Sequence, residues 1–180
     1  MVYVLLGTGF EEIEALTPVD LLRRAGIEVQ TVGLNGKTVY GGHAIGVECD
    51  LTIEQLDISD ADMIVLPGGL GGVAAIRACG KALEAVKTVY AAGKYVAAIC
   101  AGPTVLAQLG LLTGVRATCY PGQIPNMCDA QVVENAACVT DGRIITGTSA
   151  GTAVPFALAL IEALKDPEAA RAIADQIVIR

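Results

Sequence analysis

Short apolar runs alternate with longer stretches of helical periodicity along most of the chain. Apolar runs lie at residues 2–6, 63–66 and 95–99, and a further strand is predicted at 27–32. Runs of this length predict strands that are buried on both faces of a parallel sheet. The helical patterns lie at residues 11–25, 80–92, 104–109, 151–164 and from 166 onward. The alternation predicts an α/β fold, a doubly wound and mostly parallel sheet sandwiched between helices.

The first predicted helix has the clearest amphipathic pattern. Ala15, Pro18, Val19 and Leu22 fall on one face, and Gly26 stands where a C-terminal capping glycine is expected. Pro18 is expected to kink this helix or to end its regular first part, because proline lacks a backbone N–H.

Turn signals separate the remaining elements. A hairpin is predicted over residues 38–47, and a second one over 137–146 around an Asp-Gly turn. The region 114–135 is rich in turn residues, and its pattern assigns no element. The helix at 151–164 is almost wholly apolar, so we expect it to be buried.

A glycine-rich segment at 67–72 follows the third apolar run and is predicted to be a loop. Its free backbone N–H groups could cradle an anion or an oxyanion. It lacks the Lys-Ser/Thr pair of a P-loop, and its glycines do not have the spacing of a dinucleotide-binding loop.

Composition narrows the class of protein. The chain has 180 residues, 53% of them hydrophobic, which predicts a single domain over residues 1–180. A formal charge of −7 argues against nucleic acid or an anionic membrane as partner. The apolar N-terminus lacks a charged flank and predicts a strand, not a signal peptide, and no run is long enough to span a membrane. We therefore expect a cytoplasmic protein.

The cysteine pattern gives no sign of a metal or a disulfide. The six cysteines have no Cys-x-x-Cys spacing, and His43 is the only histidine. We therefore expect no metal and no cofactor, and most of the thiols reduced and inert. For four of them the sequence suggests nothing beyond packing: Cys79, Cys119, Cys128 and Cys138.

Cys100 differs from the other cysteines in its context. It ends the apolar run at 95–99, and Ala101, Gly102 and Pro103 lead from it into a helix. A strand that turns sharply into a helix, with a nucleophile at the corner, is a nucleophile elbow. The following helix would stabilise a thiolate through its N-terminal N–H groups. The alternative is that Cys100 is a small buried hydrophobic residue.

Topology favours the functional interpretation of Cys100. Ligands of open parallel sheets bind at the carboxyl ends of the strands. Three features fall there together, namely the segment 7–14, the glycine loop and Cys100.

Four motifs in this order resemble the DJ-1/ThiJ/PfpI superfamily, and its DJ-1/ThiJ branch most closely. They are Gly9-Phe-Glu-Glu-Ile-Glu14, Leu66-Pro-Gly-Gly69, Ala98-Ile-Cys-Ala-Gly-Pro103 and Ser149-Ala-Gly-Thr152. The resemblance extends over nearly the whole chain. It implies a flavodoxin-like sandwich, a homodimer and a reactive elbow cysteine.

The resemblance also implies a set of site residues. Glu14 would hydrogen-bond the Cys100 sulfur through its protonated carboxyl, with a raised pKa for Glu14 and a lowered pKa for Cys100. The backbone N–H groups of Gly69 and Ala101 would be the oxyanion donors. Gly68 and Tyr120 are further candidates for the pocket.

The chain departs from the family pattern at two positions near the site. Tyr120 stands where many members have histidine, and Ala101 stands where the peptidase-like branch has one. Peptidase and amidotransferase activities, which need a Cys-His pair, are therefore disfavoured. His43 aligns with the early hairpin, near the expected dimer surface, and is predicted to be an exposed or half-buried polar residue.

Three other residues have structural interpretations. Glu11 and Glu12 are predicted to interact favourably with the N-terminus of the first helix. Cys49 matches a position at the family's dimer contact, and burial alone would explain it equally well.

Two classes of function follow from the resemblance and remain open. The first is a cofactor-independent enzyme of glyoxalase or protein deglycase type that acts on small reactive carbonyls such as methylglyoxal, with Cys100 as nucleophile and Glu14 as acid and base. The second is a redox-sensing stress protein or chaperone whose Cys100 is oxidised to sulfinic acid without committed catalysis.

Overall fold

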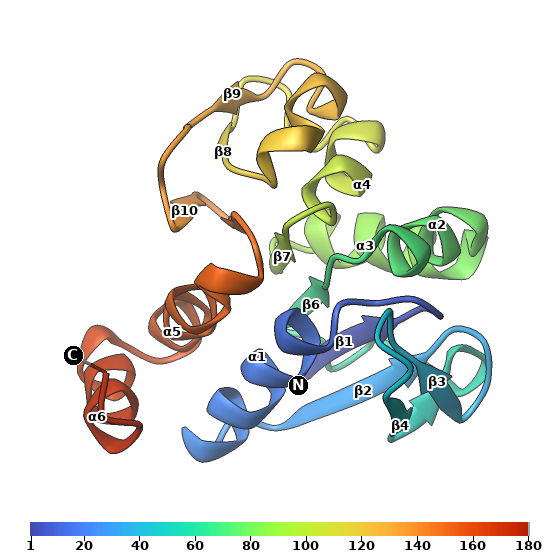
Figure 1. Ribbon diagram of the computed structural model, residues 1–180, viewed down its shortest axis with the longest axis horizontal. Helices are drawn as coiled ribbons and strands as arrows, with labels where there is room; N and C mark the ends of the chain where they lie inside the picture. Colours follow the sequence, from blue (N-terminus) through green and yellow to red (C-terminus); the bar gives the residue numbers. More distant parts are fainter. Residues whose placement is uncertain (180) are drawn as a thin grey trace.

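The computed structural model describes residues 1–179, which contain a seven-stranded sheet with helices on both faces (Figure 1). The strand order is β10-β11-β7-β6-β1-β2-β5. Neighbouring strands are parallel except for the pair β10–β11. The bounds are β1 (Val2–Leu6), β2 (Val29–Gly33), β5 (Leu51–Thr52), β6 (Met63–Leu66), β7 (Tyr95–Ile99), β10 (Cys138–Asp141) and β11 (Ile144–Gly147). The predicted fold class, a flavodoxin-like sandwich, is confirmed.

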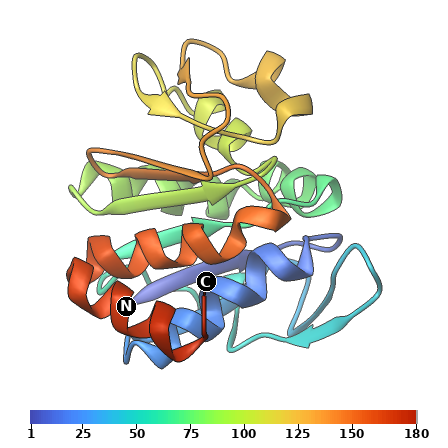
Figure 2. The ribbon, with the colours of Figure 1, turned by 60° about the vertical axis from the view of Figure 1, so that its left-hand side comes forward.

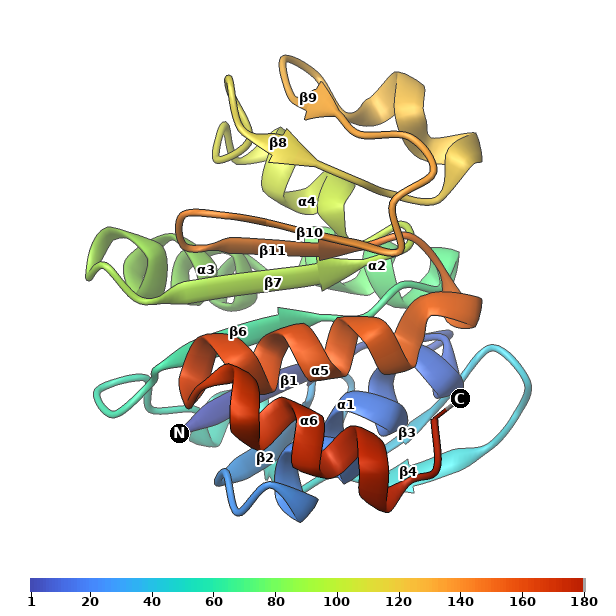
Figure 3. The ribbon, with the colours of Figure 1, turned by 90° about the vertical axis from the view of Figure 1, so that its left-hand side faces the viewer.

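The helices cover the two faces of the sheet separately (Figure 3). One face carries α1 (Glu12–Arg24), α5 (Ala153–Leu164) and α6 (Pro167–Gln176), and the other carries α2 (Leu70–Ala78), α3 (Gly80–Ala91) and α4 (Pro103–Gln108). Strand β1 shows why the apolar runs are continuous: Val4 packs toward α1 and α5, and Leu5 packs toward the opposite layer. Within residues 1–179, every helix is too short or too polar to cross a bilayer.

Smaller elements extend from the sandwich. The hairpin of β3 (Thr38–Tyr40) and β4 (Gly46–Glu48) lies beyond β2, as predicted. The turn-rich region beside α4 contains the short parallel pair β8 (Arg116–Ala117) and β9 (Gln131–Val132) with the 3-10 helix η2 (Pro121–Asn126) between them (Figure 2). Two further 3-10 helices are η1 (Ile53–Gln55) and η3 (Ala150–Thr152).

The structure corrects three predictions about the helices. Helix α1 continues through Pro18, so of the two alternatives given for this proline the ending of the helix is wrong. Helix α2 was not predicted, and it begins at Leu70, so Gly71 and Gly72 belong to a helix and not to a loop. Both glycines pack against the backbone of the segment after β1, since a Cβ on Gly72 would lie 2.8 Å from the Cα atom of Phe10. Helix α5 is buried on one face only, and its buried residues recur at helical spacing: Ala153, Phe156, Ala157, Leu160 and Ile161.

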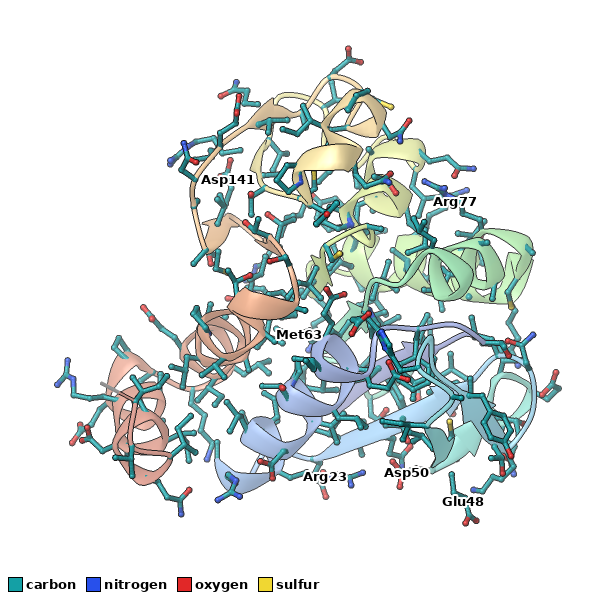
Figure 4. The ribbon with its side chains drawn as sticks, viewed as in Figure 1. Arg23, Glu48, Asp50, Met63, Arg77 and Asp141 are labelled. Carbon is teal, nitrogen blue, oxygen red and sulfur yellow. The ribbon has the colours of Figure 1, made fainter. Side chains whose placement is uncertain are left out.

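The C-terminal end of α1 is fixed by an ion pair. The Arg23 guanidinium lies 2.7 Å from the Asp50 carboxylate, and both side chains are at one edge of the molecule (Figure 4). Asp50 also accepts hydrogen bonds from the backbone N–H and the hydroxyl of Thr31 on β2. This end of α1 is thus tied to the sheet, and its opposite end reaches the carboxyl edge where the candidate site lies.

Candidate functional site

Cys100 lies at a tight turn between β7 and α4. Its φ is +63°, in the left-handed region that residues other than glycine rarely adopt, so the backbone there is strained. The Cys100 N–H donates to the carbonyl of Gly147 at 3.0 Å, which holds the strained residue on the sheet edge. Gly102 has to be glycine, because its Cβ would lie 2.5 Å from the carbonyl oxygen of Leu66. The strand–turn–helix geometry predicted around Cys100 is present.

Glu14 approaches Cys100 from the first turn of α1. Its side chain is 1% exposed, and its Oε2 atom accepts a hydrogen bond from the Gly68 N–H at 2.9 Å. Burial raises the pKa of Glu14 to about 7, although hydrogen bonds with Cys100 and Gly68 act in the opposite direction. A carboxyl with this pKa can both give and take a proton near neutral pH.

The Cys100 thiol does not have the lowered pKa that we expected. Burial first, and then the negative charge and hydrogen bond of Glu14, raise the pKa of Cys100 to about 12. The carboxylate and a thiolate would repel one another at contact distance, so the second negative charge is costly. The thiolate therefore forms when Glu14 carries the proton, because the carboxyl then donates a hydrogen bond to sulfur.

Two backbone N–H groups also reach the sulfur. Those of Ala101 and Gly69 hydrogen-bond to Cys100 and act to lower its pKa. Gly69 has a φ of +83°, and a Cβ there would overlap the backbone of Gly9 and Glu11, so only glycine fits. The predicted oxyanion donors and the predicted Glu14 are thus brought together around one sulfur atom.

Cys100 opens into a pocket of about 240 Å³. Its lining residues are Glu11, Gly69, Leu70, Cys100, Ala101, Tyr120 and Gln123. Tyr120 therefore lines the pocket as predicted, whereas Gly68 lies behind Cys100 against Glu14. Glu11 is the one charged residue in the lining among the residues that the structure describes.

Three lining residues were missed as pocket residues by the sequence reasoning. Glu11 was interpreted only as a partner of the helix N-terminus, Leu70 belongs to the helix that was not predicted, and Gln123 lies in the unassigned region. A larger hollow of about 460 Å³ lies at the opposite, amino-terminal edge of the sheet, with Lys94, Tyr95 and Arg143 in its lining. It lies at the opposite end of the strands from Cys100 and has no cysteine in its lining, so the Cys100 pocket is the candidate site.

His43 pairs with Glu12 and not with Cys100. The Glu12 carboxylate, 6% exposed, accepts hydrogen bonds from the His43 backbone N–H at 2.7 Å and from its ring Nδ1 at 2.8 Å. Burial favours the acid form of Glu12, but its hydrogen bonds with His43 outweigh burial and lower the pKa of Glu12. The pairing in turn raises the pKa of His43, which is exposed as predicted.

Glu12 and His43, together with Glu11, form the one cluster of potential metal ligands found within residues 1–179. Glu11, Glu12 and His43 each bring one ligand atom to within 4.8 Å of the others. The hydrogen bonds between Glu12 and His43 account for this arrangement without a cation.

The remaining cysteines lie outside the pocket. Cys49 is buried, and burial raises its pKa. Burial also raises the pKa of Cys119 and Cys138 to about 11. Cys128 is exposed, so it does not contribute to the core.

Comparison with known proteins assigns the family. Residues 1–163 match the DJ-1/PfpI family. The chain is 36% identical over 178 residues to the protein dj-1beta of Drosophila melanogaster, covering 98% of this chain and 95% of the relative. It therefore belongs to the DJ-1/PfpI family, as the sequence motifs indicated.

Other relatives and solved structures agree with this assignment. A protein named deglycase from Pyrococcus abyssi is 33% identical over 165 residues, covering 91% of this chain and 99% of the relative. The crystal structure of Drosophila melanogaster DJ-1beta superposes with a TM-score of 0.95 at 35% identity, covering 99% of this chain and 97% of that one. Toxoplasma gondii DJ-1 in an oxidized form has a TM-score of 0.94 at 35% identity, covering 98% and 97%.

Proposed function

We propose that the protein is a cysteine-dependent enzyme that converts small α-oxoaldehydes to 2-hydroxy acids without a metal or a nucleotide. Cys100 sulfur adds to the aldehyde carbon, and the N–H groups of Gly69 and Ala101 stabilise the oxyanion of the resulting hemithioacetal. Glu14 removes the proton from this carbon and returns one to the adjacent carbon, which leaves a thioester. Water cleaves the thioester and restores the thiol, so the atoms of aldehyde plus water equal those of the acid.

One observation carries this proposal. A buried carboxyl with a pKa of about 7 and two backbone N–H groups all contact the sulfur of a single cysteine, which faces a pocket. Proton transfer between adjacent carbons needs one group that is both acid and base at working pH, and Glu14 meets this condition.

The test is the production of D-lactate and L-lactate from methylglyoxal without glutathione. We expect activity in the wild type, and a loss of at least about a hundredfold in Cys100→Ala and in Glu14→Gln, the scale for removing an acid–base group. Cys128→Ala removes an exposed thiol elsewhere and should retain activity. Full activity in Cys100→Ala, or a wild-type rate equal to buffer, would show that the proposal is wrong.

Deglycation of proteins is a variant of the same chemistry, supported by the relatives named deglycase. An assay on a preformed adduct of methylglyoxal with a model thiol or amine distinguishes deglycase activity from glyoxalase activity. A deglycase releases lactate faster than the adduct dissociates, whereas a glyoxalase consumes only the aldehyde that has already dissociated.

The alternative is redox sensing at the same cysteine. Tyr120 stands where many family members have histidine, and oxidation needs only a thiolate. The Glu14 carboxyl and the two N–H groups are placed to hydrogen-bond a sulfinate. The oxidized form of the Toxoplasma gondii relative supports this alternative.

We also propose a homodimer. Three large exposed apolar side chains, Ile13, Tyr40 and Ile45, belong to α1 and the β3–β4 hairpin, which the Glu12–His43 pair holds together. Light scattering after size exclusion should give twice the chain mass for the wild type, and a lower mass for Ile13→Asp. Val178→Asp changes another exposed apolar side chain and should stay dimeric.

A further inference from the structure

The two N–H groups that face the Cys100 sulfur each belong to a planar peptide unit. The Gly69 N–H shares its unit with the Gly68 carbonyl, and the Ala101 N–H shares its unit with the Cys100 carbonyl. Because a trans peptide is planar, a group that holds the carbonyl also fixes the direction of the N–H at the other end.

Both carbonyls are held by donors from other parts of the chain. The Glu11 N–H donates to the Gly68 carbonyl at 3.1 Å, and the Tyr120 N–H donates to the Cys100 carbonyl at 2.9 Å. A hydrogen bond accepted by a carbonyl also polarises its peptide unit and strengthens the bond that the N–H of that unit donates. Each of these two peptide units therefore accepts one hydrogen bond at its carbonyl and donates another to the sulfur from its N–H.

We propose that Glu11 and Tyr120 are positioning residues, which act through their backbone N–H groups to orient and polarise the two peptide units that stabilise negative charge at Cys100. Their side chains are dispensable for this role. This inference rests on the site of the proposed function, but it concerns the stability of the Cys100 thiolate, which can be measured without catalytic turnover.

Proline substitutions test the backbone N–H directly. Tyr120 already has a φ of −56°, within the range of proline, so Tyr120→Pro removes the N–H while keeping this backbone angle. Tyr120→Ala removes the same ring and retains the N–H, which makes it the matched control. Glu11, at the start of α1 with a φ of −85°, offers a second pair, Glu11→Pro and Glu11→Ala.

The readout is the rate at which iodoacetamide alkylates Cys100 across a pH series. Trypsin releases Cys100 in the peptide 95–116, which contains no other cysteine, so mass spectrometry follows it alone. At pH 7 we expect each proline variant to react roughly three- to tenfold more slowly than its alanine control, equivalent to about half to one pKa unit. Equal rates within each pair would overturn the proposal.

Hydrogen exchange on the wild type tests the same bonds without any substitution. The amides of Glu11 and Tyr120 should be protected, and exchange at the rates of an unfolded chain would overturn the proposal even if the proline variants failed to fold. Absence of lactate production would leave these results unaffected. Conversely, equal alkylation rates in an active enzyme would refute only the positioning role.

Discussion

The Glu14 carboxyl and the Gly68 backbone N–H form a 2.9 Å hydrogen bond that leaves no space for a side chain at position 68. A Cβ on Gly68 would overlap the Glu14 oxygen and lie 2.7 Å from the Cβ of Cys100. Gly68 therefore brings α1, the loop after β6 and the elbow together at one point.

Gly68→Ala should separate Glu14 from Cys100. We expect a loss of roughly 1–3 kcal/mol in the free energy of unfolding, as for an overpacked core, and slower alkylation of Cys100 than in the wild type. Chemical denaturation and the alkylation assay measure the two effects. Gly80→Ala is the matched control, because a Cβ there meets nothing within 4 Å, and it should be neutral or slightly stabilising. Wild-type behaviour in Gly68→Ala would contradict the packing of this site.

The pH dependence of Cys100 alkylation should follow the Glu14–Cys100 pair. The first proton leaves the pair near the pKa of Glu14, about 7, and the second leaves near 12. Between these values the fraction of thiolate with a protonated Glu14 does not change, so the rate should rise toward pH 7 and then level off. In Glu14→Gln the plateau should be replaced by a single titration. A wild-type rate that rises steadily up to pH 10 would contradict the coupling.

Stability should depend on pH through Glu14 in the opposite sense to an ordinary carboxylate. Its pKa is raised from 4.5 to about 7 by burial, so between these values the folded state holds a proton that the unfolded state has lost. The contribution of Glu14 to the free energy of unfolding therefore falls as pH rises from 4.5 to 7, by at most about 3 kcal/mol.

Denaturation of Glu14→Gln and wild type at several pH values isolates this contribution. As pH rises from 4.5 to 7, the free energy of unfolding of Glu14→Gln should increase relative to that of the wild type. Glu84→Gln, which alters an exposed carboxyl on α3, should show no such trend. A constant difference between Glu14→Gln and wild type would show that Glu14 titrates normally.

If Cys100 is a redox sensor, a protonated Glu14 must stabilise its thiolate, and mild peroxide should then oxidise Cys100 before the other five cysteines. Cys128 is the strictest comparison, because its thiol is exposed to the oxidant and has no carboxyl partner among the described residues. Cys100 is only half-buried, and its sulfur has three hydrogen-bond partners. Peptide mass spectrometry over a time course should show sulfinic acid at Cys100 first, and more slowly in Glu14→Gln. Preferential oxidation of Cys128 would exclude a sensing role for Cys100.

Local patterns predicted the elements that carry their own signal. The strands at Met63–Leu66 and Tyr95–Ile99 follow from apolar runs of strand length, and Gly93 and Gly110 mark helix ends with positive φ. Helix α2 was not predicted because Gly71 and Gly72 are poor helix formers. They are required there by the close approach of the backbone at Thr8 and Phe10, which lies far away in sequence.

The sequence by itself determined the α/β class and the elbow around Cys100, because these depend on short-range residue patterns, whereas the pairing of Cys100 with Glu14 was implied only by the resemblance of its motifs to the family. Only the tertiary structure decided that the thiol pKa is raised, that His43 pairs with Glu12, and that Glu11 and Tyr120 hold the peptide units around the sulfur. Burial, repulsion between charges and hydrogen bonds of the main chain depend on distances between segments that only the folded chain brings together.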